Sequence, residues 1–412
     1  MTDQMTRTVT RVRGLGPLIL GFVGVQLFVN IANGGVVNSL IPNRLALLDP
    51  DNKVALLGIA AAGAAAVGVL AQPLFGMLSD RTRGALGRRL PWVLIGIVGF
   101  AVSIAALAFA ESFIMICVLV AVMTLFFSMI LAPLSAVVPD RTPVDKRGLF
   151  SALGGLGVFV GGIMGVLVAS QFLADLNIAF LVLAVIALAA LAFAFPLRES
   201  IPRELAAAKP PLRETLAGFF VNPRKHPDFF WAFTARLVLV LGFQSVLAFQ
   251  LYILADYVGL GLAEANVVYP IAVAIGTFAL ILALVPAGVI SDRIGRRKVI
   301  VVIGAVLVAI STIPPLIAPT VTSALISIGI AGLGIGVYLA VDQALMTQVL
   351  PSKADAGKDL GVLNVAQAGG QVLAPVAAAI VIGLTGYTGL YVFAGILSLA
   401  SAFAIMPIKS VK

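Results

Sequence analysis

The segment GMLSDRTRGALGRRLPW, from Gly76 to Trp92, concentrates charge within an otherwise apolar chain. A shorter version, GVISDRIGRRK, spans Gly288 to Lys298. Each lies between two apolar stretches that are long enough to cross a membrane. A charged segment that recurs in the same context indicates that the chain contains two copies of one unit.

The composition indicates a lipid environment. The chain has 412 residues, of which 61% are hydrophobic and 11% charged, whereas a soluble domain carries about 25% charged residues. These values exclude a soluble or a disordered protein. We assign the net charge of +9 to membrane-facing loops rather than to nucleic-acid binding. Because His226 and Cys117 are the single histidine and cysteine, we expect no metal site, no cofactor and no intrachain disulfide.

Twelve apolar stretches predict twelve membrane-spanning helices. Their continuous apolar character favours helices over the alternating strands of a membrane barrel. A polar, proline-containing segment from Arg198 to Asp228 divides them into two groups of six. We therefore predict an N-terminal six-helix bundle over residues 1–196, a cytoplasmic linker over 197–228 and a C-terminal six-helix bundle over 229–412. The expected spans lie near residues 17–41, 54–78, 91–110, 113–137, 149–171, 177–196, 230–253, 267–290, 298–316, 321–349, 360–384 and 387–408.

Basic residues determine the predicted orientation, because cytoplasmic loops of membrane proteins carry an excess of lysine and arginine. With both termini in the cytoplasm, every basic residue except Arg44, Lys53 and Arg236 lies on the cytoplasmic side. The opposite orientation would place nearly all of them outside. We expect a monomeric, multi-pass protein of the cytoplasmic membrane, whose partners are the lipid bilayer, a small-molecule solute and protons.

The two charged segments share the pattern G-x-x-S-D-R followed by G-R-R, after the second and the eighth predicted spans. In this pattern, in span count and in linker position, the chain resembles the major facilitator superfamily of transporters. The loop SDRTRGALGRRLPW is further similar to that of the glycoside–pentoside–hexuronide symporters and the related sucrose-transporter-like branch. The resemblance implies an all-helical membrane protein of two pseudo-symmetric bundles that expose a solute to each side of the membrane in turn.

The charged segments also predict a latch on the cytoplasmic side. Gly76 would let two helices approach closely. Asp80 and Asp292 end their helices, where they can accept hydrogen bonds from helix N-termini or arginines and hold the two halves together when the cavity opens outward. The alternative is a positively charged turn that only sets topology. The predicted latch residues are Gly76, Asp80, Arg81, Arg88, Asp140, Arg147, Gly288, Asp292, Arg293 and Arg296.

Two ionisable residues lie deep within predicted spans, Arg236 in the seventh and Asp342 in the tenth. Such residues are costly in a membrane and mark functional sites. At a helical rise of about 1.5 Å per residue they lie at similar depth, so a buried salt bridge is expected. We predict a coupling or gating role, and the alternative is a structural pair that neutralises itself. Melibiose-type cation symporters, which belong to the branch that the chain resembles, carry carboxylates in spans two and four. This chain has none there. The resemblance therefore favours protons over sodium as the coupling ion.

Polar uncharged residues recur on the spans that the resemblance places around the cavity. Gln26, Asn30 and Asn33 share one face of the first span. Amides supply both donors and acceptors, which suits a neutral polyhydroxy solute such as a sugar. The alternative is hydrogen bonding between helices. Gln371 lies one turn beyond Gln367. The predicted solute-binding residues are Gln26, Asn30, Asn33, Gln244, Tyr338, Gln343, Asn364 and Gln367.

Glycines recur at every fourth position of the fifth span, at Gly157, Gly161 and Gly165. This spacing predicts close packing against another helix. The stretch resembles the fifth span of drug/proton antiporters but lacks the proline of that motif, and the fourth span lacks an embedded arginine. Both departures disfavour drug export.

Together these observations predict a secondary active transporter that moves a small polar solute, with sugars and glycosides as the favoured class, by proton-coupled alternating access. The alternatives are an exporter of drugs or other amphipathic compounds and an uncoupled facilitator. An integral-membrane enzyme is disfavoured, because the chain offers one histidine, one cysteine and one embedded carboxylate. No G-x-x-x-x-G-K-S/T stretch is present, which excludes ATP-driven pumping by this chain alone.

Overall fold

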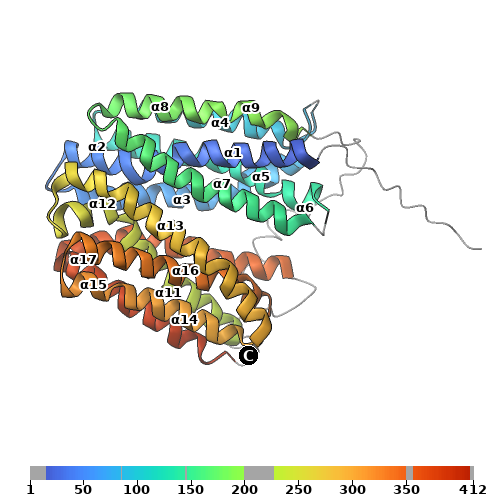
Figure 1. Cartoon of the computed structure of the whole chain (residues 1–412). Coiled ribbons are helices and arrows are strands. Elements are labelled where there is room, and N and C mark those ends of the chain that lie inside the picture. Colours follow the sequence, from blue (N-terminus) through green and yellow to red (C-terminus); the bar gives the residue numbers. More distant parts are fainter. Residues whose placement is uncertain (1–14, 85, 144–145, 199–226, 349–355, 409–412) are drawn as a thin grey trace, which may run out of the picture.

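The computed structural model describes residues 15–84, 86–143, 146–198, 227–348 and 356–408, without the side chains of 343, 344, 346–348 and 356–364. Within these residues every regular element is a helix, and most helices run side by side along one direction (Figure 1). Eleven helices of the described residues are long and apolar enough to cross a membrane. Most of the predicted linker lies outside the described residues.

The first set of helices comes from the N-terminal part of the chain. Its first crossing is continuous from Leu15 to Leu48 and contains a π-helical segment. Arg44, expected in a loop, therefore lies within a helix. The elements are α1 (Leu15–Gly35), η1 (Val36–Leu40), α2 (Ile41–Leu48), α3 (Lys53–Arg81), α4 (Leu90–Leu107), α5 (Phe113–Ser135), α6 (Val137–Arg141), α7 (Arg147–Gln171), α8 (Leu176–Ala189), α9 (Leu191–Ala194) and η3 (Phe195–Leu197).

Polar residues cap helices of this set where the chain turns. The Ser112 side chain accepts from the Met115 N–H at the start of α5, and the Asp175 side chain accepts from the first N–H groups of α8. Between α2 and α3, Asp49 accepts hydrogen bonds from the backbone and side chain of Asn52, which lower the pKa of this exposed carboxyl. These caps set the short connections between successive crossings.

The second set of helices comes from the C-terminal part and again has a π-helical segment at the far end of its first crossing, the η4 segment. Its elements are α11 (Pro227–Ala248), α12 (Gln250–Tyr252), η4 (Ile253–Tyr257), α13 (Gly261–Ile294), α14 (Arg297–Ser311), α15 (Ile313–Ile317), α16 (Val321–Gln348) and α17 (Ala356–Ile405).

The repeated charged segments have the same backbone feature. The glycine of each G-R-R triplet has a positive φ, 88° at Gly87 and 67° at Gly295. Gly295 ends α13 in the left-handed conformation, and its N–H donates to the Ser291 carbonyl at 2.9 Å. Glycine is favoured there because a side chain would clash with the following backbone. The repeat seen in the sequence is therefore a repeated turn.

The last long helix contains two crossings. Gly386, with φ 72° and ψ −173°, interrupts α17 between the predicted spans 360–384 and 387–408. Before it, the Ala374 carbonyl accepts from Ser245, near the end of α11. After it, Ser401 donates to the Ala235 carbonyl, which lies ten residues earlier in α11. The chain therefore reverses at Gly386, and the described helices provide the twelve predicted crossings.

Glycines bring α1 and α7 together. A Cβ atom at Gly161 would lie 2.8 Å from the Leu27 carbonyl oxygen, and one at Gly165 would run into the Ile31 carbonyl. Only glycine permits this approach of two backbones. The close packing predicted from the fifth span is confirmed.

The two sets share a hydrophobic core at one end of the molecule. Leu40 and Ile41 of the first set belong to the same buried cluster as Phe249, Tyr252 and Leu390 of the second. We call this end, on the left in Figure 1, the Asp256 end; the opposite end, which carries Asp140 in α6, is the Asp140 end.

Candidate functional site

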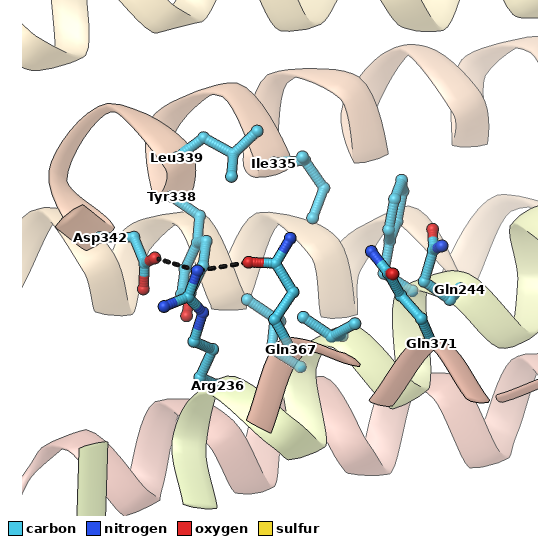
Figure 2. A pocket seen from close by; sticks show the side chains of 11 residues that line it. Arg236, Gln244, Ile335, Tyr338, Leu339, Asp342, Gln367 and Gln371 are labelled. Atoms are coloured by element: carbon cyan, nitrogen blue, oxygen red, sulfur yellow. Dashed lines mark hydrogen bonds and ion pairs between the residues drawn. The ribbon is translucent and has the colours of Figure 1, made fainter. Parts of the chain in front are cut away.

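Three helices of the second set, α11, α16 and α17, surround a cavity of about 130 Å³ (Figure 2). Apolar side chains form one part of its wall, and charged and amide side chains form the other. The lining residues are Arg236, Leu239, Val240, Phe243, Gln244, Ile335, Tyr338, Leu339, Asp342, Gln367 and Gln371.

A buried ion pair occupies one end of the cavity. Nη2 of Arg236 lies 3.4 Å from Oδ2 of Asp342, and the side chains are 4% and 2% exposed. The same guanidinium nitrogen donates a hydrogen bond to Oε1 of Gln367. Tyr338 lies one turn before Asp342, and its hydroxyl also interacts with this carboxylate. The ion pair predicted from the two intramembrane charges is therefore present.

Some polar groups near the Arg236–Asp342 ion pair have no hydrogen-bond partner among the described residues. Oδ1 of Asp342 is buried and has no hydrogen-bond partner among the described residues. Gln244 and Gln371 project into the cavity away from Arg236 (Figure 2), and neither side chain is hydrogen-bonded within the described parts of the chain. Buried polar groups ordinarily have partners, so Oδ1 of Asp342 can receive a ligand group. Gln244 is partly buried and Gln371 is exposed, so both amides are accessible to a solute in the cavity.

The structure brings five predicted residues together and separates others from them. Arg236, Gln244, Tyr338, Asp342 and Gln367 all line the cavity. Gln371, outside the predicted set, joins them because it lies one helical turn beyond Gln367 on the same face. That spacing was a usable signal. The remaining second-set predictions, Gln343 and Asn364, have side chains outside the described residues.

The predicted residues of α1 do not line this cavity. Nδ2 of Asn30 donates to the carbonyl of Gln26 at 2.7 Å and to its side-chain oxygen at 3.3 Å. These bonds stay within one helix, and both Cβ atoms lie against glycines of α7. Asn33 is partly buried. A role of Gln26, Asn30 and Asn33 in solute binding stays a prediction.

Several predicted latch residues form contacts at the Asp140 end. Asp140 pairs with Arg88 at 3.2 Å and also with Arg89, whose side chain is 2% exposed. Arg147 donates to the Pro139 carbonyl at 2.7 Å. These pairs join helices of the first set. Arg89 is not among the predicted latch residues, although it directly follows Arg88, which is.

The other latch predictions fall at helix ends. Asp292 lies 3.8 Å from Arg297 within the second set and is 78% exposed. The remaining residues at these ends are Asp80 and Arg81 of α3, Arg293 of α13 and Arg296 before α14.

The close helix contact predicted at Gly76 is absent from the arrangement of the described residues. A Cβ atom at Gly76 or at Gly288 would meet no atom within 4 Å. The two helices therefore do not approach closely at either glycine, and added side chains would find open space.

Polar contacts join the two sets at the Asp256 end. Asn43 and Asn266 exchange two amide hydrogen bonds of 2.9 and 2.7 Å, and the Tyr252 hydroxyl donates to the Pro42 carbonyl at 2.7 Å. Asp256 accepts from Lys53 at 2.7 Å. Tyr387 also donates to Asp256, at 2.8 Å. We call these residues the clasp: Pro42, Asn43, Lys53, Tyr252, Asp256, Asn266 and Tyr387.

Comparison with known proteins gives a consistent result. The sequence profile described as Major Facilitator Superfamily matches residues 23–283 and, in a second match, 245–411. No curated protein sequence matches the chain.

Solved structures with the same fold include two transporters. One is the nucleoside transporter NupG, with 16% identity, a TM-score of 0.74 and coverage of 95% of this chain and 98% of that one. Another is a D-xylose–proton symporter, with 16% identity, a TM-score of 0.72 and coverage of 94% and 96%. At this identity the likeness concerns the fold alone.

Proposed function

Because the chain belongs to the Major Facilitator Superfamily, we propose that it is a proton-coupled secondary transporter of the cytoplasmic membrane that moves a small polyhydroxylated solute, of the sugar or glycoside class. One observation carries this proposal: a buried ion pair, Arg236–Asp342, faces a cavity that is otherwise polar only through amides and a tyrosine. Charged side chains within a membrane persist where a substrate or ion pathway uses them.

The amides support a hydroxylated solute. Gln244, Gln367 and Gln371 together offer donors and acceptors, and each solute hydroxyl needs both. The adjacent apolar wall, with Ile335 and Leu339, suits the carbon face of such a molecule. The nucleoside and xylose named for two structural neighbours are hydroxylated solutes as well.

Asp342 is the proposed proton site. It belongs to the membrane-spanning part of α16 and faces the cavity, where a proton entering with the solute can reach it. Protonation changes the charge of Asp342 and so weakens its attraction to Arg236. An ion pair with two such states can link proton binding to solute binding.

Alternating access would require the clasp to open. The contacts between the sets described above lie at the Asp256 end, whereas the ion pairs described at the Asp140 end join helices of one set. The arginine-rich turns at the Asp140 end favour a cytoplasmic location for it. We infer an inward-facing arrangement, and we keep the predicted cytoplasmic latch as a contact of the outward-facing one.

Uptake by proteoliposomes tests the proposal. Purified protein should accumulate a radiolabelled solute from a panel of sugars, glycosides and sugar acids when the outside is acidic, and a protonophore should abolish the accumulation. Asp342→Asn should lose accumulation, while Asp175→Asn, which removes an exposed carboxylate at the start of α8, should retain it. Uptake of lipophilic cations without sugars would favour the exporter alternative. Gradient-independent uptake that survives Asp342→Asn would favour an uncoupled facilitator.

A further inference from the structure

We propose that the solute carries one carboxylate besides its hydroxyl groups, and that this carboxylate replaces Asp342 as the partner of Arg236 when Asp342 takes up a proton. This inference rests on the proposed function and names the solute class of the same site. It starts from the charge balance of the cavity.

The ion pair leaves the cavity without net charge. Arg236 and Tyr338 are the charged and titratable groups that interact with Asp342 in the described part of the chain. With Asp342 ionised, the guanidinium of Arg236 is neutralised; with Asp342 protonated, a buried cation of 4% exposure has no counter-charge. Leaving one partner of a buried pair uncompensated is strongly unfavourable. A neutral solute cannot correct this imbalance, whereas a carboxylate can.

The geometry provides a place for a second carboxylate. Arg236 projects from α11 between Asp342 and Gln367 (Figure 2) and lines the cavity. A guanidinium presents five N–H donors and binds carboxylates through two parallel hydrogen bonds. Gln367 holds one nitrogen of the guanidinium, so the group stays in position when Asp342 releases it.

The part of the cavity away from the ion pair suits the hydroxylated part of the solute. Gln244 and Gln371 lie away from the ion pair and are not hydrogen-bonded within the described residues, so they can bind hydroxyl groups. The volume of about 130 Å³ fits a small molecule. The site therefore suits a hydroxylated monocarboxylate that points its carboxylate at Arg236.

The exchange of partners balances protons and charges. One proton binds an oxygen of Asp342, and one carboxylate takes its place beside Arg236, so no net charge is added to the cavity. On release, Asp342 loses the proton and re-forms the ion pair, which displaces the carboxylate. Neither the proton nor the anion is favoured alone, which couples their movements one to one.

A matched pair of probes tests this inference. Gluconate and glucitol have the same carbon chain and differ in one carboxylate. Binding to the purified full chain is measured by ligand-induced thermal stabilisation between pH 5.5 and 7.5. Gluconate should bind wild-type protein about tenfold more tightly for each pH unit of acidification, because one proton is taken up, and glucitol should not. Glycerate and glycerol form a second, smaller pair.

Variants separate the parts of the exchange. Asp342→Asn should bind gluconate at least tenfold more tightly than wild type at pH 7.5, without pH dependence, because Arg236 lacks its internal partner. Arg236→Gln should lose the preference for gluconate over glucitol. If either single variant fails to fold, Arg236→Gln combined with Asp342→Asn removes both charges and should bind the two probes alike.

The binding and uptake results distinguish a failure of the carboxylate exchange from a failure of the proposed function. Equal binding of the acid and its neutral counterpart by wild type, or loss of gluconate binding in Asp342→Asn, would overturn the inference; binding of none of the four probes would overturn it too. Proton-coupled uptake of glucitol or another neutral sugar alcohol would overturn it while the proposed function stands. Absence of any solute uptake by proteoliposomes would instead refute the proposed function.

Discussion

The amide pair of the clasp should stabilise the arrangement that is closed at the Asp256 end. Replacing Asn43 by alanine removes both hydrogen bonds to Asn266, where the side chains are 3% and 5% exposed. The buried Asn266 oxygen then lacks its donor, a cost of about 1–3 kcal/mol. Because Nδ2 of Asn266 keeps its bond to the Leu262 carbonyl at 2.8 Å, we expect the lower part of that range. A cost of about 1–2 kcal/mol lowers the closed population by a factor of roughly 5 to 30 relative to the open one.

Distances between paired spin labels measure this shift. In a Cys117→Ala background, Gln171→Cys with Glu264→Cys reports the Asp256 end, and Ser151→Cys with Ile294→Cys reports the Asp140 end. Asn43→Ala should lengthen the first distance and shorten the second. Asn52→Ala, which removes an exposed amide bonded only within the first set, is the matched control and should change neither.

A double-mutant cycle measures the interaction energy between Asn43 and Asn266. Asn43→Ala and Asn266→Ala remove the same pair of hydrogen bonds, so their combined effect should be smaller than the sum by about 1 kcal/mol. Unchanged label distances in Asn43→Ala, or strictly additive effects of the two substitutions, would refute the role assigned to the amide pair.

Three further predictions concern stability, read as the apparent melting temperature in detergent. Asp256→Asn removes the ion pair with Lys53, in which the Lys53 side chain is 17% and the Asp256 side chain 33% exposed. The substitution should lower the free energy of unfolding by at most about 1 kcal/mol, which is less than for Asn43→Ala. A larger effect would contradict this ranking. Gly165→Ala places a Cβ atom 2.6 Å from the Gly35 nitrogen and should cost about 1–3 kcal/mol, whereas Gly155→Ala meets no atom within 4 Å and should be neutral. Gly386→Ala forces a side chain to φ 72° and ψ −173°, a backbone conformation open essentially to glycine alone, and should cost about 1–3 kcal/mol. Gly383→Ala, where a Cβ atom meets no atom within 4 Å, should not have this cost. Equal melting temperatures would show that the reversal in α17 tolerates a side chain.

The sequence predicts the crossings well because hydropathy and length determine which segments enter a membrane. It also predicts the break near Gly386 and the pairing of Arg236 with Asp342, since intramembrane charges are few and must be compensated. It does not predict the amide pair of the clasp. Asn43 and Asn266 lie 223 residues apart at the margins of predicted spans, where each looks like a loop residue.

The surroundings of Gly76 and Asn30 depend on how the helices pack together and not only on the residues that each helix contains. Gly76 resembles a contact glycine by its residue type, yet a Cβ atom there would meet no atom within 4 Å. Asn30 looks like a cavity residue by position, yet its amide bonds to its own helix. A pattern on one helix identifies a shared face, but the partner of that face is decided by tertiary packing.

The two π-helical segments determine which way the side chains that follow them point. A π turn contains one residue more than an α turn, so every side chain beyond it is rotated by about 100° relative to an uninterrupted helix. Asn43 follows η1 directly, and Asp256 lies inside η4. Deleting one residue from Val36–Leu40 would restore a continuous α-helix and turn Asn43 away from Asn266. The alignment of the clasp therefore depends on the number of residues that precede it in the helix. Deleting one apolar residue from this segment would break the Asn43–Asn266 hydrogen bonds, as a substitution of Asn43 would.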